Sequence, residues 1–404
     1  MANQQASLLT AIDVGSAKTR ALVAEVTDNG LRYRGHGVAD SRGSRKGVIV
    51  ELDKAVAAIQ KAVEAAEDAA GAPVEHAIVG IGGAHVRGVN SHGGISLGTR
   101  PREIGRDEIK QAVERARAIP LPADREILHL LPQEFILDEQ PGVRDPLGMM
   151  AARLEVRVHL VTAATSATQN VITAVNKAGV VVDDTVFEPL AAADAVLRAD
   201  ERELGVCLAD IGAGSTDLIV YYEGVVIHTG AIPVGGDHFT NDLAVGLRTP
   251  IPEAEKIKRE HAQACRELLS EDTPIEIASV GDRPPRTIFA RMVADITEPR
   301  AQELLMLIRD ELRRAGLESQ IPAGLVLTGG GAHLRGLAEL AERLFNLPVR
   351  VAVPRGLGEM SDQVSQPEYA TAVGLVLYGA RTRRVAGARP TGFMGKLKSM
   401  FAGA

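Results

Sequence analysis

The sequence predicts an α/β protein of two related lobes, with two inserted subdomains and a separate C-terminal segment. A chain of 404 residues is long for one domain and suggests two or three. Strand-like and helix-like segments alternate along most of its length, which is typical of α/β folds. A glycine-containing motif at Asp13–Thr19 recurs at Asp210–Asp217, and each copy ends one apolar strand and opens another. This repeat indicates two similar domains around a cleft.

Composition limits the classes of function that the chain can serve. Hydrophobic residues make up 45% of it and charged residues 24%, the proportions of a globular protein. The two cysteines, Cys207 and Cys265, are too few for a disulfide framework and fit a reducing compartment. The first residues lack the pattern of a signal peptide, and no run reaches the roughly 18 apolar residues of a membrane span. We therefore expect neither a secreted nor a membrane-spanning protein.

The net charge of −7 is unevenly distributed. No acidic residue follows Glu368, whereas six basic residues do, which leaves −13 for the first 368 residues. An acidic body repels nucleic acid, and a basic end attracts an anionic surface. The sequence therefore argues against a nucleic-acid partner. The six basic residues are Arg381, Arg383, Arg384, Arg389, Lys396 and Lys398.

The first predicted lobe opens with a three-stranded meander, because Asp28-Asn29-Gly30 is a strong hairpin-turn signal between alternating apolar runs. Its strands are predicted at 8–14, 20–26 and 33–39. A helix follows whose buried face is formed by Val56, Ile59, Val63 and Ala66, and 76–82 has the pattern of a strand. We assign to this lobe 7–83, 163–195 and 356–380.

Two blocks interrupt the α/β pattern and are predicted to be inserted subdomains. The first, 84–162, carries a helix near 107–118 and two strands, 126–137 and 152–161. The second, 241–300, is polar and helical with one strand at 274–280. The second lobe is assigned to 196–240 and 301–355, and a long helix is predicted at 298–314.

Each copy of the repeated motif has the composition of a phosphate-binding turn. Glycine supplies a bend whose N–H groups can point at an anion, and serine adds a hydroxyl donor. Lys18 adds a point charge able to reach a terminal phosphate. Asp13 and Asp210 would hold Mg²⁺ through water, because this ion dehydrates reluctantly. One such turn alone is usually only a turn, but two facing copies would clamp a triphosphate. The phosphate-binding candidates are Gly15, Ser16, Lys18, Gly212, Gly214 and Ser215.

Three further features of the sequence could contribute to the same triphosphate site. Glu188 lies at a strand-to-helix junction, where a carboxylate can orient an attacking water or merely complement the helix dipole. The glycines of Gly329–Gly331 follow an apolar strand and either admit a flat purine or form a flexible connector. Glu255 and Lys258 share one helix face, suited to ribose and adenine hydrogen bonds or to a plain ion pair.

As an ordered set, these motifs resemble the actin/chaperone/sugar-kinase ATPase superfamily. The motifs are Ala11–Ser16, Phe187–Ala193, Asp210–Asp217 and Leu327–Ala332. Within that superfamily, the sequence is similar to the FtsA family of bacterial cell-division proteins, the actin-like partners of FtsZ. The segment Pro233–Ala244, the helix that carries Glu255 and Lys258, and the insertion at 84–162 match the pattern of that family.

The resemblance implies an actin-like two-lobed ATPase fold with ATP and Mg²⁺ bound between the lobes. It places Asp210 near Mg²⁺ and Glu188 near the hydrolytic water. It also implies self-association through 84–162, and contacts with the nucleoside and with FtsZ through 241–300. The nucleotide-binding residues that it implies are Asp13, Gly15, Ser16, Lys18, Asp210, Gly212, Gly214, Ser215, Thr216, Glu255, Lys258, Gly329, Gly330 and Gly331.

The segment 392–404 is a separate amphipathic signal, in which apolar residues at helical spacing share one face with lysines beside it. Each lysine contributes about 1 kcal/mol near anionic lipid, which supports reversible binding that a polymer of many copies would strengthen. The alternative is a helix docked on the protein body. We expect 381–391 to be a basic linker. The membrane-binding candidates are Phe393, Met394, Lys396, Leu397, Lys398, Met400 and Phe401.

Together, these features predict an ATP-binding adaptor that self-associates on the cytoplasmic face of the inner membrane at the division septum, tethers FtsZ and assists Z-ring assembly. Other division proteins are further candidate partners, and hydrolysis through Glu188 would be slow. A related actin-like pilus-assembly adaptor is the main alternative. A small-molecule kinase on the same fold is weaker, because no catalytic carboxylate for a second substrate is evident. A chaperone ATPase is disfavoured because no peptide-binding domain follows the lobes.

Overall fold

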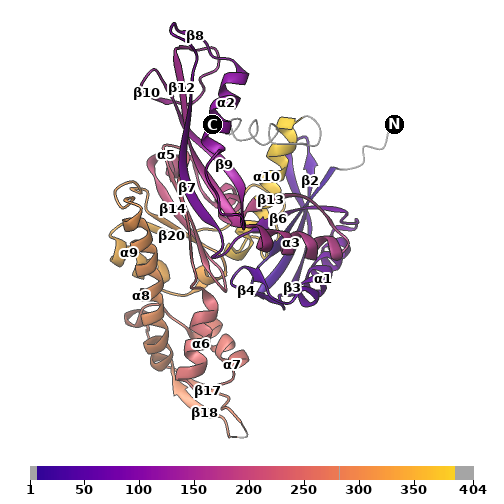
Figure 1. The fold of residues 1–404 in the computed structure, drawn as a ribbon. Coiled ribbons are helices and arrows are strands. Elements are labelled where there is room, and N and C mark those ends of the chain that lie inside the picture. The colour runs from indigo at the N-terminus through magenta and orange to yellow at the C-terminus, as the bar shows by residue number, and fades with distance from the viewer. Residues whose placement is uncertain (1–6, 282, 387–404) are drawn as a thin grey trace.

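The computed structural model describes residues 7–281 and 283–386. Two lobes, each built on a five-stranded sheet, lie side by side, and two smaller units extend from them toward opposite ends of the molecule (Figure 1). Each unit has a cluster of buried apolar side chains, and the cluster of the first lobe continues onto one face of the second sheet through Val206, Leu208 and Ile219. The predicted two-lobed α/β fold is confirmed.

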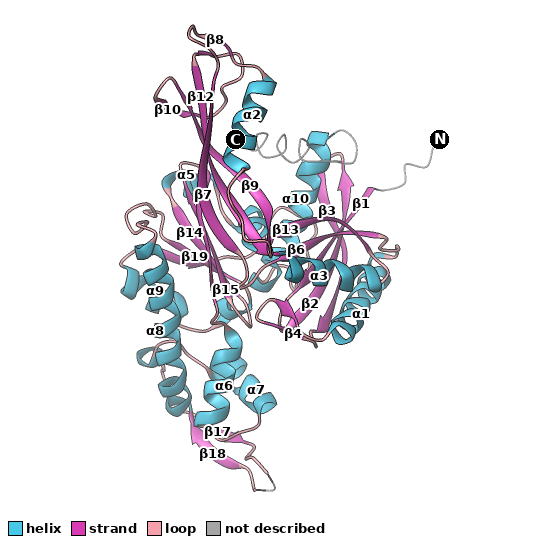
Figure 2. Cartoon of the chain, in the orientation of Figure 1, coloured by secondary structure: helices cyan, strands magenta, loops and turns pink. Residues whose placement is uncertain are grey.

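The first lobe is a sheet of order β13-β6-β1-β2-β3, in which three antiparallel strands are followed by two that run parallel to β1. Helix α1 packs against β2 and β3, whereas α10 packs against β1 and α4 (Figure 2). The strands are β1 (Ser7–Val14), β2 (Lys18–Thr27), β3 (Gly30–Asp40), β6 (His76–Ile81) and β13 (Val181–Phe187). The helices are α1 (Leu52–Ala70), α3 (Thr165–Lys177), α4 (Glu188–Val196) and α10 (Ala370–Ala386).

Helix α1 approaches its sheet closely because glycines line β3. A Cβ at Gly37 would lie 2.0 Å from the carbonyl oxygen of Ala62, so no larger residue fits there. Three of the predicted face residues, Ile59, Val63 and Ala66, are buried. The helix ends at Gly71, whose φ of 65° is the left-handed conformation that favours glycine at a helix C-terminus.

The second lobe repeats this plan with a sheet of order β16-β15-β14-β19-β20. The strands β14, β15 and β16 form an antiparallel meander, and β19 runs parallel to β14. Its strands are β14 (Val206–Ile211), β15 (Thr216–Tyr222), β16 (Val225–Ile232), β19 (Leu325–Thr328) and β20 (Val349–Val351). Its helices are α5 (Ala199–Leu204), α8 (Ala290–Arg314) and α9 (Leu337–Phe345), with the 3-10 helices η2 (Gly330–His333) and η3 (Pro367–Tyr369).

The first inserted unit leaves the first lobe after β6 and returns to it before α3. Its sheet has the order β10-β9-β12-β7, and helix α2 packs against β7 and β12. The unit contains β7 (Arg87–Ser96), β8 (Arg102–Glu103), α2 (Arg106–Arg117), β9 (Arg125–Leu137), β10 (Gln140–Val143), β11 (Met150–Ala151) and β12 (Arg153–Ala164).

This unit also reaches the second lobe through polar contacts with the edge strand β16. The Nδ2 of Asn90 donates to the carbonyl of Ile227 at 3.2 Å, and the buried imidazole of His159 lies between Asn90 and Thr229. Burial lowers the pKa of His159 to about 3. The ring is therefore neutral near pH 7, donating to the Asn90 oxygen and accepting from the Thr229 hydroxyl. A Cβ at Gly88 would lie 2.3 Å from the Thr229 oxygen, so this contact also requires glycine.

The second inserted unit corrects two predictions. It contains a two-stranded hairpin rather than one strand, and α8 begins at Ala290 rather than at 298. The helix continues through Pro299 because one face of its first turns is buried, and Thr297 donates to the carbonyls of Val293 and Gln263. The unit contains α6 (Gly236–Gly246), α7 (Ile251–His261), η1 (Arg266–Leu268), β17 (Pro274–Ile277) and β18 (Arg286–Phe289).

The predicted basic linker at 381–391 starts too early. Helix α10 continues through Ala386, and Arg381 pairs with Asp194 at 2.9 Å while Thr382 is buried. The carboxylate of Asp194 thus holds the end of α10 against α4. The seven predicted membrane-binding residues lie outside the described residues. Among those described, no helix combines the length and hydropathy that a membrane-spanning segment needs.

Candidate functional site

The two predicted phosphate turns face each other. The β1–β2 turn belongs to the first lobe and the β14–β15 turn to the second. A Cβ at Gly214 would lie 2.8 Å from the Oγ of Ser16, so the two turns approach to van der Waals contact. The N–H of Gly212 donates to the carbonyl of Ser215 at 2.9 Å and closes the second turn. The floor of the cleft is therefore formed by both lobes.

The two hairpins share the same register around these turns. Asp13 lies opposite Arg20 in the first hairpin, and Asp210 lies opposite Asp217 in the second. Residues directly opposite in an antiparallel pair lie on one face of the sheet. Each hairpin therefore presents its first aspartate beside a second charged side chain, which is basic in the first lobe and acidic in the second.

Four carboxylates converge at this floor. Asp13 and Asp217 are buried, and Asp210 and Glu188 are partly buried beside them. Glu188 begins helix α4, and its carboxylate fills the space that glycines of β6 and the following turn leave open. A Cβ at Gly82 would lie 2.2 Å from its Oε2. Glu188 therefore turns toward the other carboxylates and does more than complement the dipole of its helix.

Burial and mutual repulsion raise the pKa values of this group. Burial raises the pKa of Asp217 to about 7, with a further contribution from the charge of Asp210. Burial likewise raises the pKa of Asp210 to about 6, against a hydrogen bond from the Thr371 hydroxyl at 3.0 Å. Burial raises the pKa of Glu188 well above its usual value, and the other three carboxylates raise it further.

Positive charge at the floor is scarce. Burial raises the pKa of Asp13, although Arg20 opposes the rise from 3.4 Å. Carboxylate oxygens suit Mg²⁺, which keeps several waters and binds through few direct ligands. Among the described residues, no three His, Cys, Asp or Glu side chains form a group that could hold a metal ion directly. The carboxylate oxygens of Asp13 and Asp210, at the strand ends beside the two turns, are of the donor type that Mg²⁺ prefers.

Two predicted phosphate ligands have other partners. Lys18 forms an ion pair with Asp40 and not with the cleft carboxylates. The hydroxyl of Thr216 is fully buried and donates to the carbonyl of Val234 at 2.8 Å. The side chain of Ser16 faces the second turn and accepts a hydrogen bond from the N–H of Gly47 at 3.1 Å.

The predicted nucleoside residues adjoin the second turn. Gly329 has a φ of 79°, and a Cβ there would lie 2.3 Å from the Oδ1 of Asp210. Lys258 contacts Glu255 at 2.6 Å and donates to the carbonyl of Gly236 at 3.1 Å. The N–H of Gly236 in turn donates to Gly212. The glycine turn at 329–331 therefore lies against the end of β14, and α7 is linked to the β14–β15 turn through Gly236.

Sequence reasoning missed two features of the site. Asp217 was part of the repeated motif, and the hairpin register that places it opposite Asp210 would have identified it. The second feature is a small hairpin, β4 (Ser44–Arg45) and β5 (Val48–Ile49), whose turn touches both phosphate turns. No sequence motif indicated that this hairpin belongs to the site, because its contact with Gly214 joins distant parts of the chain.

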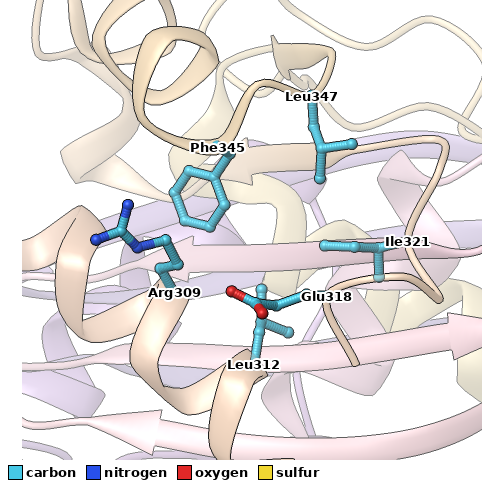
Figure 3. Close-up of a pocket in the computed structure, with 6 residues that line it drawn as sticks. All are labelled: Arg309, Leu312, Glu318, Ile321, Phe345 and Leu347. Atoms are coloured by element: carbon cyan, nitrogen blue, oxygen red, sulfur yellow. The ribbon is translucent and has the colours of Figure 1, made fainter. Parts of the chain in front are cut away.

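A separate small cavity of about 110 Å³ lies in the second lobe, at the ends of α8 and α9 (Figure 3). Its lining is mostly apolar, with Arg309 and Glu318 beside it. Pockets for small molecules are typically ~300–1,000 Å³, so this cavity is too small for a nucleotide. It contains none of the predicted site residues.

The fold and the paired turns together define a protein of the actin-like class, and solved structures agree. A chain of the PilM–PilN type IV pilus biogenesis complex aligns with a TM-score of 0.67 at 20% identity, over 92% of this chain and 98% of its own. MreB5 of Spiroplasma citri bound to ADP aligns with a TM-score of 0.58 at 14% identity, over 94% and 98%. At such identities the likeness establishes the fold alone.

Sequence similarity then establishes the family. Residues 207–374 match the family model for cell division protein FtsA, and 83–162 match that for the SHS2 domain inserted in FtsA. Cell division protein FtsA of Pseudomonas aeruginosa is 46% identical over 377 residues, which covers 93% of this chain and 90% of the relative. The chain belongs to the FtsA family of cell-division proteins. The resemblance inferred from the motifs is confirmed, and the pilus-adaptor and kinase alternatives lose their support.

Proposed function

We propose that this cell-division protein binds ATP with Mg²⁺ in the cleft between its lobes. The observation that carries the proposal is the pair of hairpins in identical register, whose turns meet over four buried or partly buried carboxylates. Turn N–H groups and Ser16 and Ser215 would hold the phosphates, Asp13 and Asp210 would hold Mg²⁺ through water, and Gly329–Gly331 with α7 would border the nucleoside. Magnesium would supply the charge that offsets the carboxylates and the phosphates.

Calorimetric titration of ATP–Mg²⁺ into wild type and Asp210→Asn tests the nucleotide site. The asparagine keeps the shape and can still accept from Thr371, but it removes one charge near the ion. Loss of a hydrogen bond to a charged group costs about 1.5–3 kcal/mol, so we expect affinity to fall by at least tenfold. The exposed Asp28→Asn variant is the matched control. Equal affinity in Asp210→Asn and wild type would remove the basis of the proposal.

Glu188 is the proposed residue that orients the attacking water. In the empty cleft, burial and three neighbouring carboxylates favour its protonated form, which cannot accept a proton from water. Charge compensation in the loaded cleft would restore the carboxylate. We therefore propose slow hydrolysis, with ATP acting mainly as a ligand that fixes the orientation of the lobes. Loss of turnover in Glu188→Gln, with ATP affinity kept, would assign this role.

The unit at 241–300 is the proposed contact with FtsZ. Several large apolar side chains of this unit are exposed, including Val280, Phe289 and Met292. Exposed apolar residues on a separate unit favour a partner-binding surface. Phe289→Ala should weaken co-pelleting with FtsZ polymers, whereas Leu204→Ala, an exposed apolar residue of the second lobe, should not. Equal co-pelleting of all three proteins would exclude Phe289 from the contact.

The insertion at 84–162 is the proposed self-association unit. Leu147, Met149 and Met150 are exposed near β11. Replacing Met150 with lysine should reduce assembly in sedimentation velocity while leaving ATP affinity unchanged. Unchanged assembly would place the contact elsewhere on the unit.

Attachment to the cytoplasmic face of the inner membrane is proposed through 392–404. The support is its amphipathic pattern, with Lys396 and Lys398 beside the apolar face. Deleting 392–404 should abolish co-sedimentation with anionic liposomes, and neutral liposomes serve as the control. Undiminished binding by the truncated chain would refute the tether.

A further inference from the structure

The hairpin at 44–49, here called the basic hairpin, brings two cations to the mouth of the cleft. Its central residues Lys46 and Gly47 have φ values of 53° and 76°. Positive φ at both central positions is the geometry of a tight two-residue hairpin turn. Glycine adopts it freely, whereas lysine is held there at a cost of about 1–3 kcal/mol. The position of Lys46 is therefore fixed by its surroundings.

The turn of this hairpin contacts both phosphate turns. The N–H of Gly47 donates to the Oγ of Ser16 in the first turn. A Cβ at Gly214 in the second turn would lie 2.8 Å from both the nitrogen and the Cα of Lys46. The backbone of Lys46 is therefore wedged between the lobes, where the two turns meet.

Three other cations around the cleft already have carboxylate partners. Lys18 pairs with Asp40, Arg20 contacts Asp13, and Lys258 contacts Glu255. The positive charge of Arg45 is felt by Asp237 of the second inserted unit. Burial raises the pKa of Asp237, and nearby positive charges, including that of Arg45, oppose the rise. Within 8–281 and 283–383, the exposed side chain of Lys46 forms neither an ion pair nor a hydrogen bond.

We propose that Lys46 is the positioning residue for the terminal phosphate of a bound triphosphate, the role that the sequence suggested for Lys18. The inference rests on the proposed nucleotide site. A triphosphate carries one more phosphate than a diphosphate, and a phosphate chain held by both turns would bring its last phosphate toward the place where Lys46 contacts them. A flexible lysine anchored there supplies a point charge without first breaking an ion pair. Lys46 thereby makes the cleft distinguish ATP from ADP.

Two variants isolate the charge from the backbone. Lys46→Asn removes the charge, and asparagine tolerates the left-handed conformation that this position requires. Lys46→Arg keeps the charge. Lys54→Asn is the matched control, because Lys54 lies in the first turn of α1 near the hairpin and pairs with Glu51 at 2.7 Å. The readout is the ratio of the ADP and ATP dissociation constants for the full chain with Mg²⁺, measured by calorimetry.

A charge-assisted contact confined to the terminal phosphate predicts a selective effect. Lys46→Asn should weaken ATP binding by about tenfold to a hundredfold and change ADP binding by less than about twofold. Lys46→Arg should retain most of the discrimination, and Lys54→Asn all of it. A variant that merely relaxed the hairpin would shift both nucleotides together, so an unchanged ratio overturns the inference. The inference is also overturned if Lys18→Asn, and not Lys46→Asn, changes the ratio of the ADP and ATP dissociation constants. Wild type that binds neither nucleotide refutes the site itself, and the inference with it.

Discussion

Replacing Asp217 with asparagine should stabilise the empty protein and weaken its ligand binding. In the folded chain, burial raises the pKa of Asp217 from 3.8 to about 7. Between these two values the unfolded chain releases a proton that the folded chain retains. The folded state therefore loses stability as pH rises from about 4 to about 7 and stays destabilised above that range.

The size of this effect follows from the pKa difference. A rise from 3.8 to about 7 corresponds to about 4 kcal/mol at ~1.4 kcal/mol per unit. The gain in Asp217→Asn is smaller, because the remaining carboxylates ionise more readily once Asp217 is neutral. We expect about 2–4 kcal/mol at pH 8 and no difference at pH 4. The asparagine oxygen can still accept from the N–H of Gly83, which lies 3.2 Å from the carboxylate.

Urea unfolding in EDTA without nucleotide, at several pH values, tests this expectation, with the exposed Asp28→Asn as the control. The same variant should bind ATP–Mg²⁺ less tightly, because it removes charge that would balance the ion. An Asp217→Asn protein less stable than wild type at pH 8 would refute the reasoning. It would mean that the hydrogen bonds of this carboxylate outweigh its burial and repulsion.

Three further perturbations test other contacts. Thr229→Val leaves the buried ring nitrogen of His159 without its 2.9 Å partner and should cost about 1–3 kcal/mol; faster amide exchange in β16 and β7 would report it, and Thr229→Ser should restore protection. The 2.6 Å pair of His333 and Glu368 raises the pKa of the histidine and lowers that of the glutamate, against burial in both cases. Its stabilisation should fade as pH rises above 6.5 and as it falls below 4.5, and Glu368→Gln should return the NMR titration of His333 to a lower pKa. Asp194→Asn leaves two guanidinium groups without their shared carboxylate and should cost about 2–4 kcal/mol, with faster exchange at the end of α10; unaltered exchange there would show that the pair does not hold the helix.

The hairpins could be predicted from the sequence because their signals are local. Apolar alternation locates the strands, and the glycine turns fix where they reverse, so Asp13 and Asp210 were placed correctly at the ends of their strands. Predicting which residue pairs with Lys18 required more than the alternation of apolar residues. From the tight turn, Thr27 pairs with Gly30, and this register would bring Lys18 opposite Ala39. A bulge between Val23 and Ala24 shifts the pairing by one residue and brings it opposite Asp40.

Other features depended on contacts between distant segments. No local pattern shows that residue 46 touches residue 214, because that contact exists only once the two lobes are packed together. Pro299 shows that a local signal can also mislead. Proline usually marks a helix boundary, yet buried residues on both sides of it keep α8 continuous. Burial of a whole helix face outweighs the loss of one backbone hydrogen bond.

The difference between the two hairpins indicates how the cleft is closed. They share a register, but Arg20 lies opposite the first aspartate, whereas Asp217 lies opposite the second. The first lobe therefore brings a partly compensated pair to the cleft, and the second brings two carboxylates that repel each other. The pair of aspartates without a basic partner belongs to the second lobe, while the cations that remain near the mouth, Arg45 and Lys46, belong to the first. A magnesium-bound phosphate chain would contact both sets at once. Its binding energy would be greatest with the lobes held together, which couples occupancy of the cleft to the relative position of the units that each lobe carries.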